Sequence, residues 1–163
     1  MANPRVTVEY LWNRYDYRDG LLINKQTRGR MKTGVPAGTP NKAGYLRVTL
    51  FQRQEYVHRL IFFMFNNYWP KEIDHIDRDV SNNRIENLRD CSRSQNMANR
   101  SSPNTVRGVH FNGSSYIARI GNPFSRKTEY IGSYPTEEIA AKAYDIKAKE
   151  YFGDFAVLNF PEE

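Results

Sequence analysis

The residues with the clearest capacity for chemistry are a carboxylate and an imidazole that are adjacent in the sequence, Asp74 and His75. They follow the short approach Glu72-Ile73 and precede a turn-forming segment rich in Asp and Asn. On an extended strand, neighbouring side chains point to opposite faces. Asp74 could therefore bind a cation on one side while His75 deprotonates a water without being a ligand itself.

A helix downstream of this pair carries the second candidate ligand, Asn96. Ser92 with Gln95 three residues later forms a capping box, which predicts that the helix begins there. Two strands followed by this helix would let Asp74 and Asn96 converge on one hard cation. Their oxygen atoms suit Mg²⁺ or Mn²⁺ better than Zn²⁺, because no thiolate or second imidazole is nearby. We therefore expect one such cation per active site.

Two other interpretations compete for this stretch. An Asx-rich turn between structural elements explains Asn82 and Asn83 but does not explain an Asp-His pair placed on a strand. A calcium-binding loop is excluded: counting from Asp77, the sixth position is Asn82 rather than Gly and the twelfth is Leu88 rather than Glu.

The spacing of Asp74-His75, Asn87 and Asn96, together with the segment NNRIENL, resembles the HNH nuclease motif. That motif belongs to the ββα-metal fold of phage homing endonucleases and colicin-type nucleases. The resemblance implies that His75 is the general base and that Asp74 and Asn96 bind the metal. It also implies that Asn87 completes the catalytic set by bracing the loop that orients His75. Asn96 stands where the family often has His, which should weaken zinc binding.

Composition favours a polyanionic partner. The 163 residues carry a net charge of +6, and such a basic balance favours nucleic acid. The sequence has no apolar run of membrane-spanning length and no apolar signal segment at its start, so we expect no membrane association and a cytoplasmic location. The resemblance to phage homing endonucleases implies that this is the cytoplasm of a bacterial host. A single cysteine, Cys91, excludes an internal disulfide and a multi-cysteine zinc site.

The positive charge is concentrated near the start of the chain. Residues 1–57 hold ten Lys and Arg against four Asp and Glu, and they are expected to form short strands, such as 21–23 and 45–51, separated by turns. Five basic residues crowd the segment between these strands, and the first four are the candidates for DNA contact: Lys25, Arg28, Arg30, Lys32 and Lys42. They form either a solvated basic loop or an extended arm that contacts phosphates.

The next stretch, Val57 to Phe65, is apolar almost all round and predicts a buried helix. His58 opens this helix and is expected to be structural rather than catalytic. After Asn99, the polar segment from Arg100 to Thr105 is the expected domain boundary.

The last third predicts three short strands, within 107–109, 116–120 and 129–132, and a helix capped by Thr136. Through RGV, YIARI, YIGSYPTEEIAAKAYD and LNF, it resembles the plant ethylene-response-factor (APETALA-type) DNA-binding domain. In that family the sheet enters the major groove. The resemblance implies the following DNA-facing residues: Arg107, His110, Tyr116, Arg119, Lys127 and Tyr130. His110 and Tyr130 stand where Arg and Trp are usual, so the target sequence does not carry over. Sheet packing is an equal alternative for Tyr116 and Tyr130.

The sequence thus predicts a modular α+β chain with three parts: a basic β-rich region (1–56), an HNH nuclease core of ββα-metal type (57–100) and a three-stranded sheet packed on one helix (101–163). The expected function is site-specific, homing-type cleavage of double-stranded DNA, in which a monomer nicks one strand. Two alternatives stay open: a DNA-binding regulator without nuclease activity and an RNA-binding protein.

Overall fold

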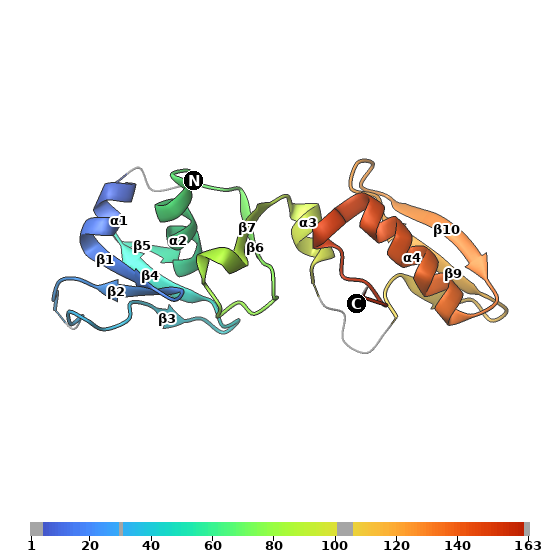
Figure 1. Cartoon of the computed structure of the whole chain (residues 1–163), viewed down its shortest axis with the longest axis horizontal. Coiled ribbons are helices and arrows are strands. Elements are labelled where there is room, and N and C mark those ends of the chain that lie inside the picture. Colours follow the sequence, from blue (N-terminus) through green and yellow to red (C-terminus); the bar gives the residue numbers. More distant parts are fainter. Residues whose placement is uncertain (1–4, 30, 101–105, 162–163) are drawn as a thin grey trace. The chain divides into compact units, whose positions relative to one another are not determined.

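The computed structural model describes residues 5–29, 31–100 and 106–161, which form two compact units that divide after Cys91. Each unit combines helices with small antiparallel sheets (Figure 1), which confirms the predicted α+β class. None of the helices in these ranges has the length and apolar character to cross a membrane.

The first unit alternates short helices and strand pairs. Its elements in chain order are α1 (Val8–Arg14), β1 (Tyr15–Arg18), β2 (Leu21–Asn24), β3 (Thr39–Pro40), β4 (Leu46–Leu50), β5 (Arg53–Tyr56), α2 (Val57–Asn66), β6 (Glu72–His75), the 3-10 helix η1 (Ile85–Asn87) and β7 (Leu88–Cys91). The strands pair as β1-β2, β3-β4-β5 and β6-β7. The predicted strands at 21–23 and 45–51 are confirmed as β2 and β4.

Helix α1 is an element that the expectation of strands and turns over residues 1–57 missed. Thr7 caps it, because its hydroxyl accepts a hydrogen bond from the Tyr10 amide at 3.0 Å. Leu11 is its fully buried residue and packs in the core of the first unit. The helix therefore anchors the start of the chain.

The core of the first unit is built around α2, as the apolar run predicts. Seven of its ten residues are buried, including Leu60, Ile61 and Phe62. The helix ends at Asn67, which adopts the left-handed conformation with φ 58°. The same core extends from Val6 to Leu88, so residues of the predicted parts 1–56 and 57–100 share one hydrophobic core.

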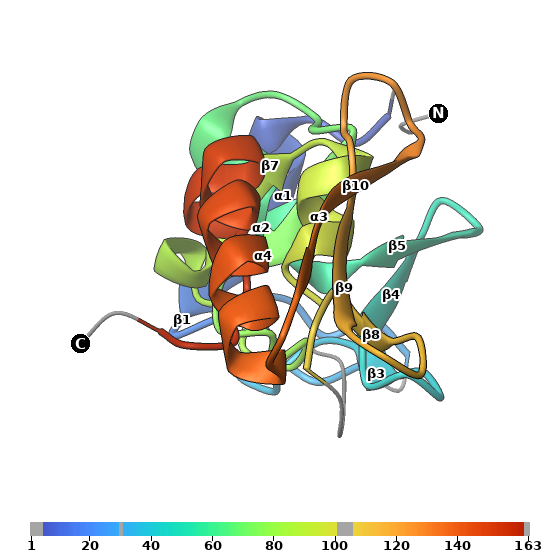
Figure 2. The same cartoon turned by 90° about the vertical axis from the view of Figure 1, so that its right-hand side faces the viewer.

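The second unit contains the predicted helix after Ser92 and the predicted three-stranded sheet, whose first strand lies at 109–111 rather than 107–109. Its elements are α3 (Arg93–Ala98), β8 (Val109–Phe111), β9 (Tyr116–Gly121), β10 (Thr128–Tyr134), α4 (Glu137–Phe152) and the 3-10 helix η2 (Gly153–Phe155). The capping box of Ser92 and Gln95 and the Thr136 cap are both present. Figure 2 shows α4 lying along the sheet, which it contacts through all three strands.

The closing segment of the second unit is tied to α4 by a buried carboxylate. Asp145 accepts hydrogen bonds from the backbone amides of Asn159 and Phe160, both at 2.9 Å. The Asn159 side chain in turn accepts from the Arg107 amide and donates to the Arg107 carbonyl. The predicted boundary at residues 100–105 falls almost entirely on 101–105, which lie outside the described residues.

Candidate active site

The antiparallel pair β6-β7 places Asp74 and His75 in the interior of the first unit. The register pairs Asp74 with Arg89 and His75 with Leu88. Both Asp74 and His75 are 5% exposed. Adjacent positions on a strand direct these side chains to opposite faces, as the sequence predicts.

Arg89 is a partner of Asp74 that the sequence did not reveal. Its Nε donates to Asp74 Oδ2 at 2.8 Å, and its Nη2 lies 2.8 Å from the same oxygen. The guanidinium thus sets an opposite charge beside the buried carboxylate and satisfies one of its oxygens. Since Arg89 pairs with Oδ2, a cation at Asp74 would share the carboxylate with Arg89 or displace it.

His75 is held by a side-chain amide. Its Nε2 lies 3.1 Å from Asn83 Oδ1, and Asn83 is only 2% exposed. A carbonyl oxygen only accepts hydrogen bonds, so this pairing assigns the proton of a neutral imidazole to Nε2 and makes Nδ1 the basic nitrogen. A general base needs such a fixed tautomer.

His58 forms part of the wall beside His75. The two rings meet edge to face, with centroids 5.1 Å apart, and Tyr45 lies against both. Burial, followed by repulsion from His75 and Arg59, lowers the pKa of His58 to about 3. His58 is therefore neutral near pH 7, in keeping with the structural role expected of it.

Asn87 ties together the two ends of the loop that follows His75. Its side-chain oxygen accepts from the Asp77 amide at 3.0 Å, and its nitrogen donates to Asp77 Oδ1 and to the Asn82 carbonyl. The Asn87 carbonyl also accepts from the Ile76 amide at 2.9 Å. These bonds hold the loop and do not involve His75 itself, so the bracing role stays a prediction that they support.

The same loop is ordered by the Asp77 carboxylate. Partial desolvation works to raise the pKa of Asp77, but hydrogen bonds from Asn82, the Asp79 amide and Asn87 outweigh it, and the pKa falls below its ordinary value. Asp77 is therefore ionised at neutral pH and keeps its acceptor oxygens available to the loop.

Residues 17–20, which are distant in sequence, pack against the backbone around Asn83. The Ile85 amide donates to the Tyr17 hydroxyl at 2.9 Å. Gly20, in the β1-β2 turn, packs so closely that a Cβ there would lie 2.8 Å from the Asn83 carbonyl carbon and 2.7 Å from the Arg84 amide nitrogen. Residues 17–20 thus help to position a residue that binds His75, a contact that no local pattern in the sequence signals.

The predicted metal ligands are one carboxylate and one amide. Asp74 belongs to the first unit and Asn96, on α3, to the second, so their convergence on one cation stays a prediction. Within the described ranges, no three His, Cys, Asp or Glu side chains gather as a metal site would. The oxygen donors themselves fit Mg²⁺ or Mn²⁺.

The residues predicted to face DNA from the sheet divide between its two faces. Cross-strand pairing places Arg119 opposite Tyr130 and His110 opposite Ile117, so His110, Arg119 and Tyr130 share one face. Tyr116 alternates with them and lies on the face of Ala118 and Ile120, which packs on α4.

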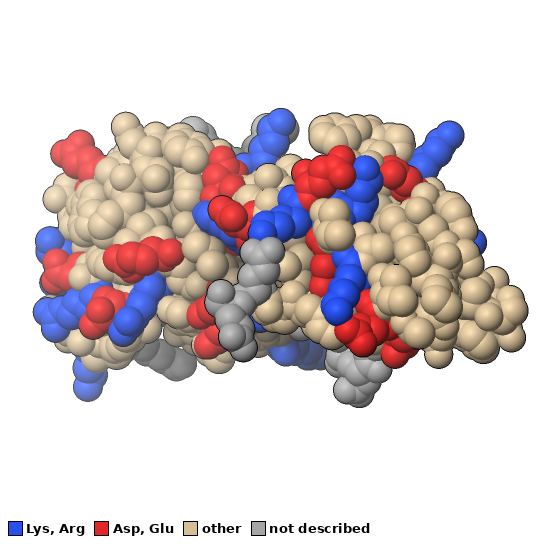
Figure 3. Space-filling model, turned by 45° about the vertical axis from the view of Figure 1, so that its right-hand side comes forward, with Lys and Arg blue, Asp and Glu red and all other residues tan. Residues whose placement is uncertain are grey.

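Other predicted contact residues have structural partners. Arg107 Nη1 donates to the Ala98 carbonyl at 2.5 Å, and Lys25 Nζ donates to the Trp12 carbonyl and pairs with Asp16 at 3.4 Å. Arg28 lies in a tight turn whose backbone bonds to Met31, while Lys32 and Lys127 are exposed. Arg30 lies outside the described residues. On the face drawn in Figure 3, basic and acidic side chains are interspersed rather than forming one basic surface.

Comparison with known proteins supports both resemblances. Residues 55–98 match the family described as HNH endonuclease, a span that runs from β5 to the end of α3. An uncharacterised HNH endonuclease of Acanthamoeba polyphaga mimivirus is 36% identical over 107 residues, which cover 63% of this chain and 56% of that protein.

Plant transcription factors match as well. An AP2-like ethylene-responsive transcription factor of Arabidopsis thaliana is 52% identical over 56 residues, covering 33% of this chain and 16% of that protein. The ethylene-responsive transcription factor WRI1 of the same plant is 35% identical over 104 residues, covering 57% of this chain and 24% of that protein. The chain spans about half the length of the viral relative and less of the plant ones. The chain is therefore related both to HNH endonucleases, through residues 55–98, and to the AP2-like ethylene-responsive transcription factors.

Proposed function

We propose that the chain is a divalent-metal-dependent DNA endonuclease of homing type, which binds double-stranded DNA as a monomer and nicks one strand. The observation that carries the proposal is the Asp74-His75 pair, which lies inside the HNH match and is held on one side by Arg89 and on the other by Asn83. An Asx-rich turn between structural elements would not require a buried Asp-His pair in which each side chain has its own partner.

In the proposed reaction, Nδ1 of His75 takes a proton from a water molecule. The water oxygen forms a bond to phosphorus in line with the breaking P–O3′ bond, which yields a 5′-phosphate and a 3′-hydroxyl after the leaving oxygen is protonated. Asn83 keeps the Nε2 proton of His75 in place during this transfer, and Arg89 holds the Asp74 carboxylate by its hydrogen bond and ion pair. A cation held by Asp74 and Asn96 would neutralise charge on the phosphate and on the leaving oxygen.

DNA contact is proposed for the basic segment with Lys25, Arg28, Arg30 and Lys32 and for the AP2-like sheet. His110, Arg119 and Tyr130 support the second assignment, because all three are exposed on the sheet face away from α4. Tyr116 is better explained by packing on α4, and Arg107 does not lie with these three but is half-buried and bonded to Ala98.

A second candidate function is a DNA-binding regulator without nuclease activity, which the similarity to plant transcription factors favours. Incubation with a DNA library and Mg²⁺, followed by mapping of the ends, separates the two. We expect discrete cut sites with 5′-phosphates, which a chelator abolishes. Sequence-selective binding with no new ends at any Mg²⁺ or Mn²⁺ concentration would establish the regulator instead.

A further inference from the structure

The second unit contains a hollow of about 760 Å³ whose walls come from α3, from the β9-β10 hairpin and from α4. Its apolar floor includes Ile120, Tyr144 and Phe152. These three side chains lie between the sheet and α4. The hollow is therefore on the helix side of the sheet and not on the face that presents His110, Arg119 and Tyr130.

The lining of the hollow is strongly basic. Arg93, Arg107, Arg126 and Lys127 contribute to it, and none of the residues that line it is Asp or Glu. Arg93, Arg126 and Lys127 are exposed, whereas Arg107 is half-buried and fixed in the wall by its bond to Ala98. A guanidinium carries five N–H donors, so this bond leaves Arg107 able to bind a phosphate as well.

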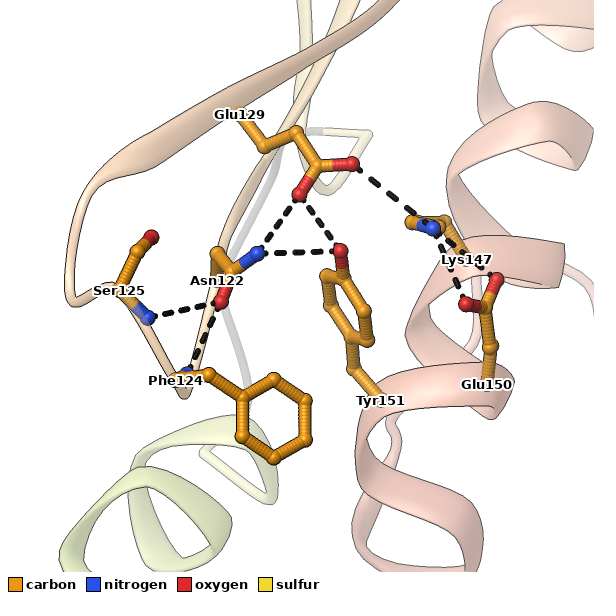
Figure 4. A network of polar contacts seen from close by, with 7 residues as sticks. All are labelled: Asn122, Phe124, Ser125, Glu129, Lys147, Glu150 and Tyr151. Atoms are coloured by element: carbon orange, nitrogen blue, oxygen red, sulfur yellow. Dashed lines mark hydrogen bonds and ion pairs between the residues drawn. The ribbon is translucent and has the colours of Figure 1, made fainter.

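The hairpin that carries Arg126 and Lys127 is held in one conformation by Asn122. Its Oδ1 accepts from the amides of Phe124 and Ser125 at 2.9 and 3.0 Å, and its backbone bonds to Arg126 and Lys127. Figure 4 shows how the Asn122 side chain also reaches Glu129 and Tyr151, while Lys147 of α4 pairs with Glu129.

This network has two consequences for the hollow. Glu129, the acid closest in sequence to the basic pair, is engaged by Tyr151, Asn122 and Lys147, and these contacts hold its pKa below the ordinary value. The two cations are also presented on a turn that is already ordered, which reduces the entropy lost when a ligand binds.

We propose that this hollow binds the phosphodiester backbone of DNA, at a stretch separate from the one that contacts the open face of the sheet. The open rim of cations suits a continuous polyanion that passes along it, and the apolar floor suits the carbon edges of deoxyribose between successive phosphates. The inference deepens the DNA-binding part of the proposed function and rests on it.

The test measures binding of a DNA duplex of about 30 base pairs by fluorescence anisotropy between 50 and 200 mM salt, with magnesium omitted so that no strand is cut. In a plot of log Kd against log salt concentration, each unit of slope corresponds to about one phosphate contact. The hollow variant is Arg126→Asn with Lys127→Gln, with Asn chosen because Arg126 has φ 58°. The matched control, Lys142→Gln with Lys149→Gln, removes the same charge from exposed positions on α4.

We expect the hollow variant to bind about tenfold more weakly and its salt slope to fall by about two, while the control keeps the wild-type slope. Equal salt slopes for the two variants, with wild-type DNA binding intact, would refute DNA binding by the hollow and leave the proposed function untouched. Wild-type protein that binds no DNA would refute the proposed DNA-binding role itself. Calorimetric titration with inorganic phosphate is a second test. If the wild type binds free phosphate tightly, the hollow variant loses that binding and its DNA salt slope is unchanged, the hollow is a small-anion site. That result would also overturn the proposal.

Discussion

The imidazole of His75 is oriented by an uncharged amide. The Asn83 oxygen fixes which nitrogen carries the proton and adds no negative charge to a buried site. Asn83 is therefore a positioning residue in the proposed reaction: it acts through His75 and has no need to touch DNA.

Replacement of Asn83 by Leu should separate orientation of His75 from DNA binding. The variant removes the acceptor at similar volume, so we expect cleavage to slow by about 100-fold while DNA affinity stays within a few-fold. Nitrogen NMR of His75 should show a loss of the Nε2-H tautomer. The control is Asn82→Leu, which removes a bond to Asp77 but leaves the His75 contact in place. An unchanged tautomer and rate in Asn83→Leu would exclude the positioning role.

His58 should make the protein sensitive to acid. Its pKa is about 3 in the folded state against an ordinary value of 6.5. The unfolded chain therefore binds the extra proton between these values, and stability is lost as pH falls through 6.5 toward 3. The full difference in the free energy of unfolding is on the order of 5 kcal/mol.

The variant His58→Phe removes this proton while it keeps an aromatic ring beside His75. Urea unfolding at pH 7 and pH 4.5 should show a smaller loss of stability on acidification for the variant than for wild type. Identical losses would mean that His58 is not held neutral by the fold.

At the scale of elements, the β1-β2 turn buttresses the loop that supplies Asn83. The Tyr17 hydroxyl accepts a hydrogen bond from the Ile85 amide, and Gly20 lies against the backbone of Asn83 and Arg84. Part of the predicted basic region is thus a structural support for the predicted nuclease core.

Gly20→Ala should disturb this support. Gly34→Ala is a closely matched control, because the two glycines have φ of 84° and 80° but a Cβ at Gly34 meets nothing within 4 Å. The strain of a positive φ is common to both, so the difference between them reports the clash. We expect Gly20→Ala to lower the free energy of unfolding by about 2 kcal/mol more than Gly34→Ala, measured by urea unfolding. Equal losses of stability in the two variants would show that the β1-β2 turn accommodates the Cβ and does not depend on the close contact at Gly20.

The elements that the sequence predicted are those with local signals. The apolar run predicted α2, and the caps at Ser92 and Thr136 predicted the starts of α3 and α4. Helix α1 was missed because Val6, Thr7 and Val8 are β-branched and favour strand. The strand position of Asp74 and His75 was predicted from the sequence, but the residues that contact them were not. Arg89 reaches Asp74 through strand register, and Tyr17 meets Ile85 only in the folded chain.

At the scale of the whole molecule, each chain offers one Asp-His pair, and one such pair is in line with one phosphodiester at a time. Different predicted DNA-contacting segments lie near the two ends of the chain, which suits an asymmetric target better than a palindrome read by a symmetric dimer.

A supercoiled plasmid that carries the target tests this expectation. At low enzyme concentration we expect relaxed circles to accumulate before any linear DNA, because a monomer cuts one strand per encounter. Direct formation of linear DNA without a relaxed intermediate would show paired active sites and contradict the nicking monomer.

The central claim is that His75 is the base of a metal-dependent nuclease, and single-turnover cleavage by His75→Ala in Mg²⁺ tests it most directly. DNA affinity is measured in parallel by anisotropy, with wild type plus a chelator as the metal-free reference. We predict that the variant binds DNA within a few-fold of wild type and cleaves at least 100-fold more slowly, and that the chelator stops wild-type cleavage. Cleavage by His75→Ala at close to the wild-type rate would contradict the account.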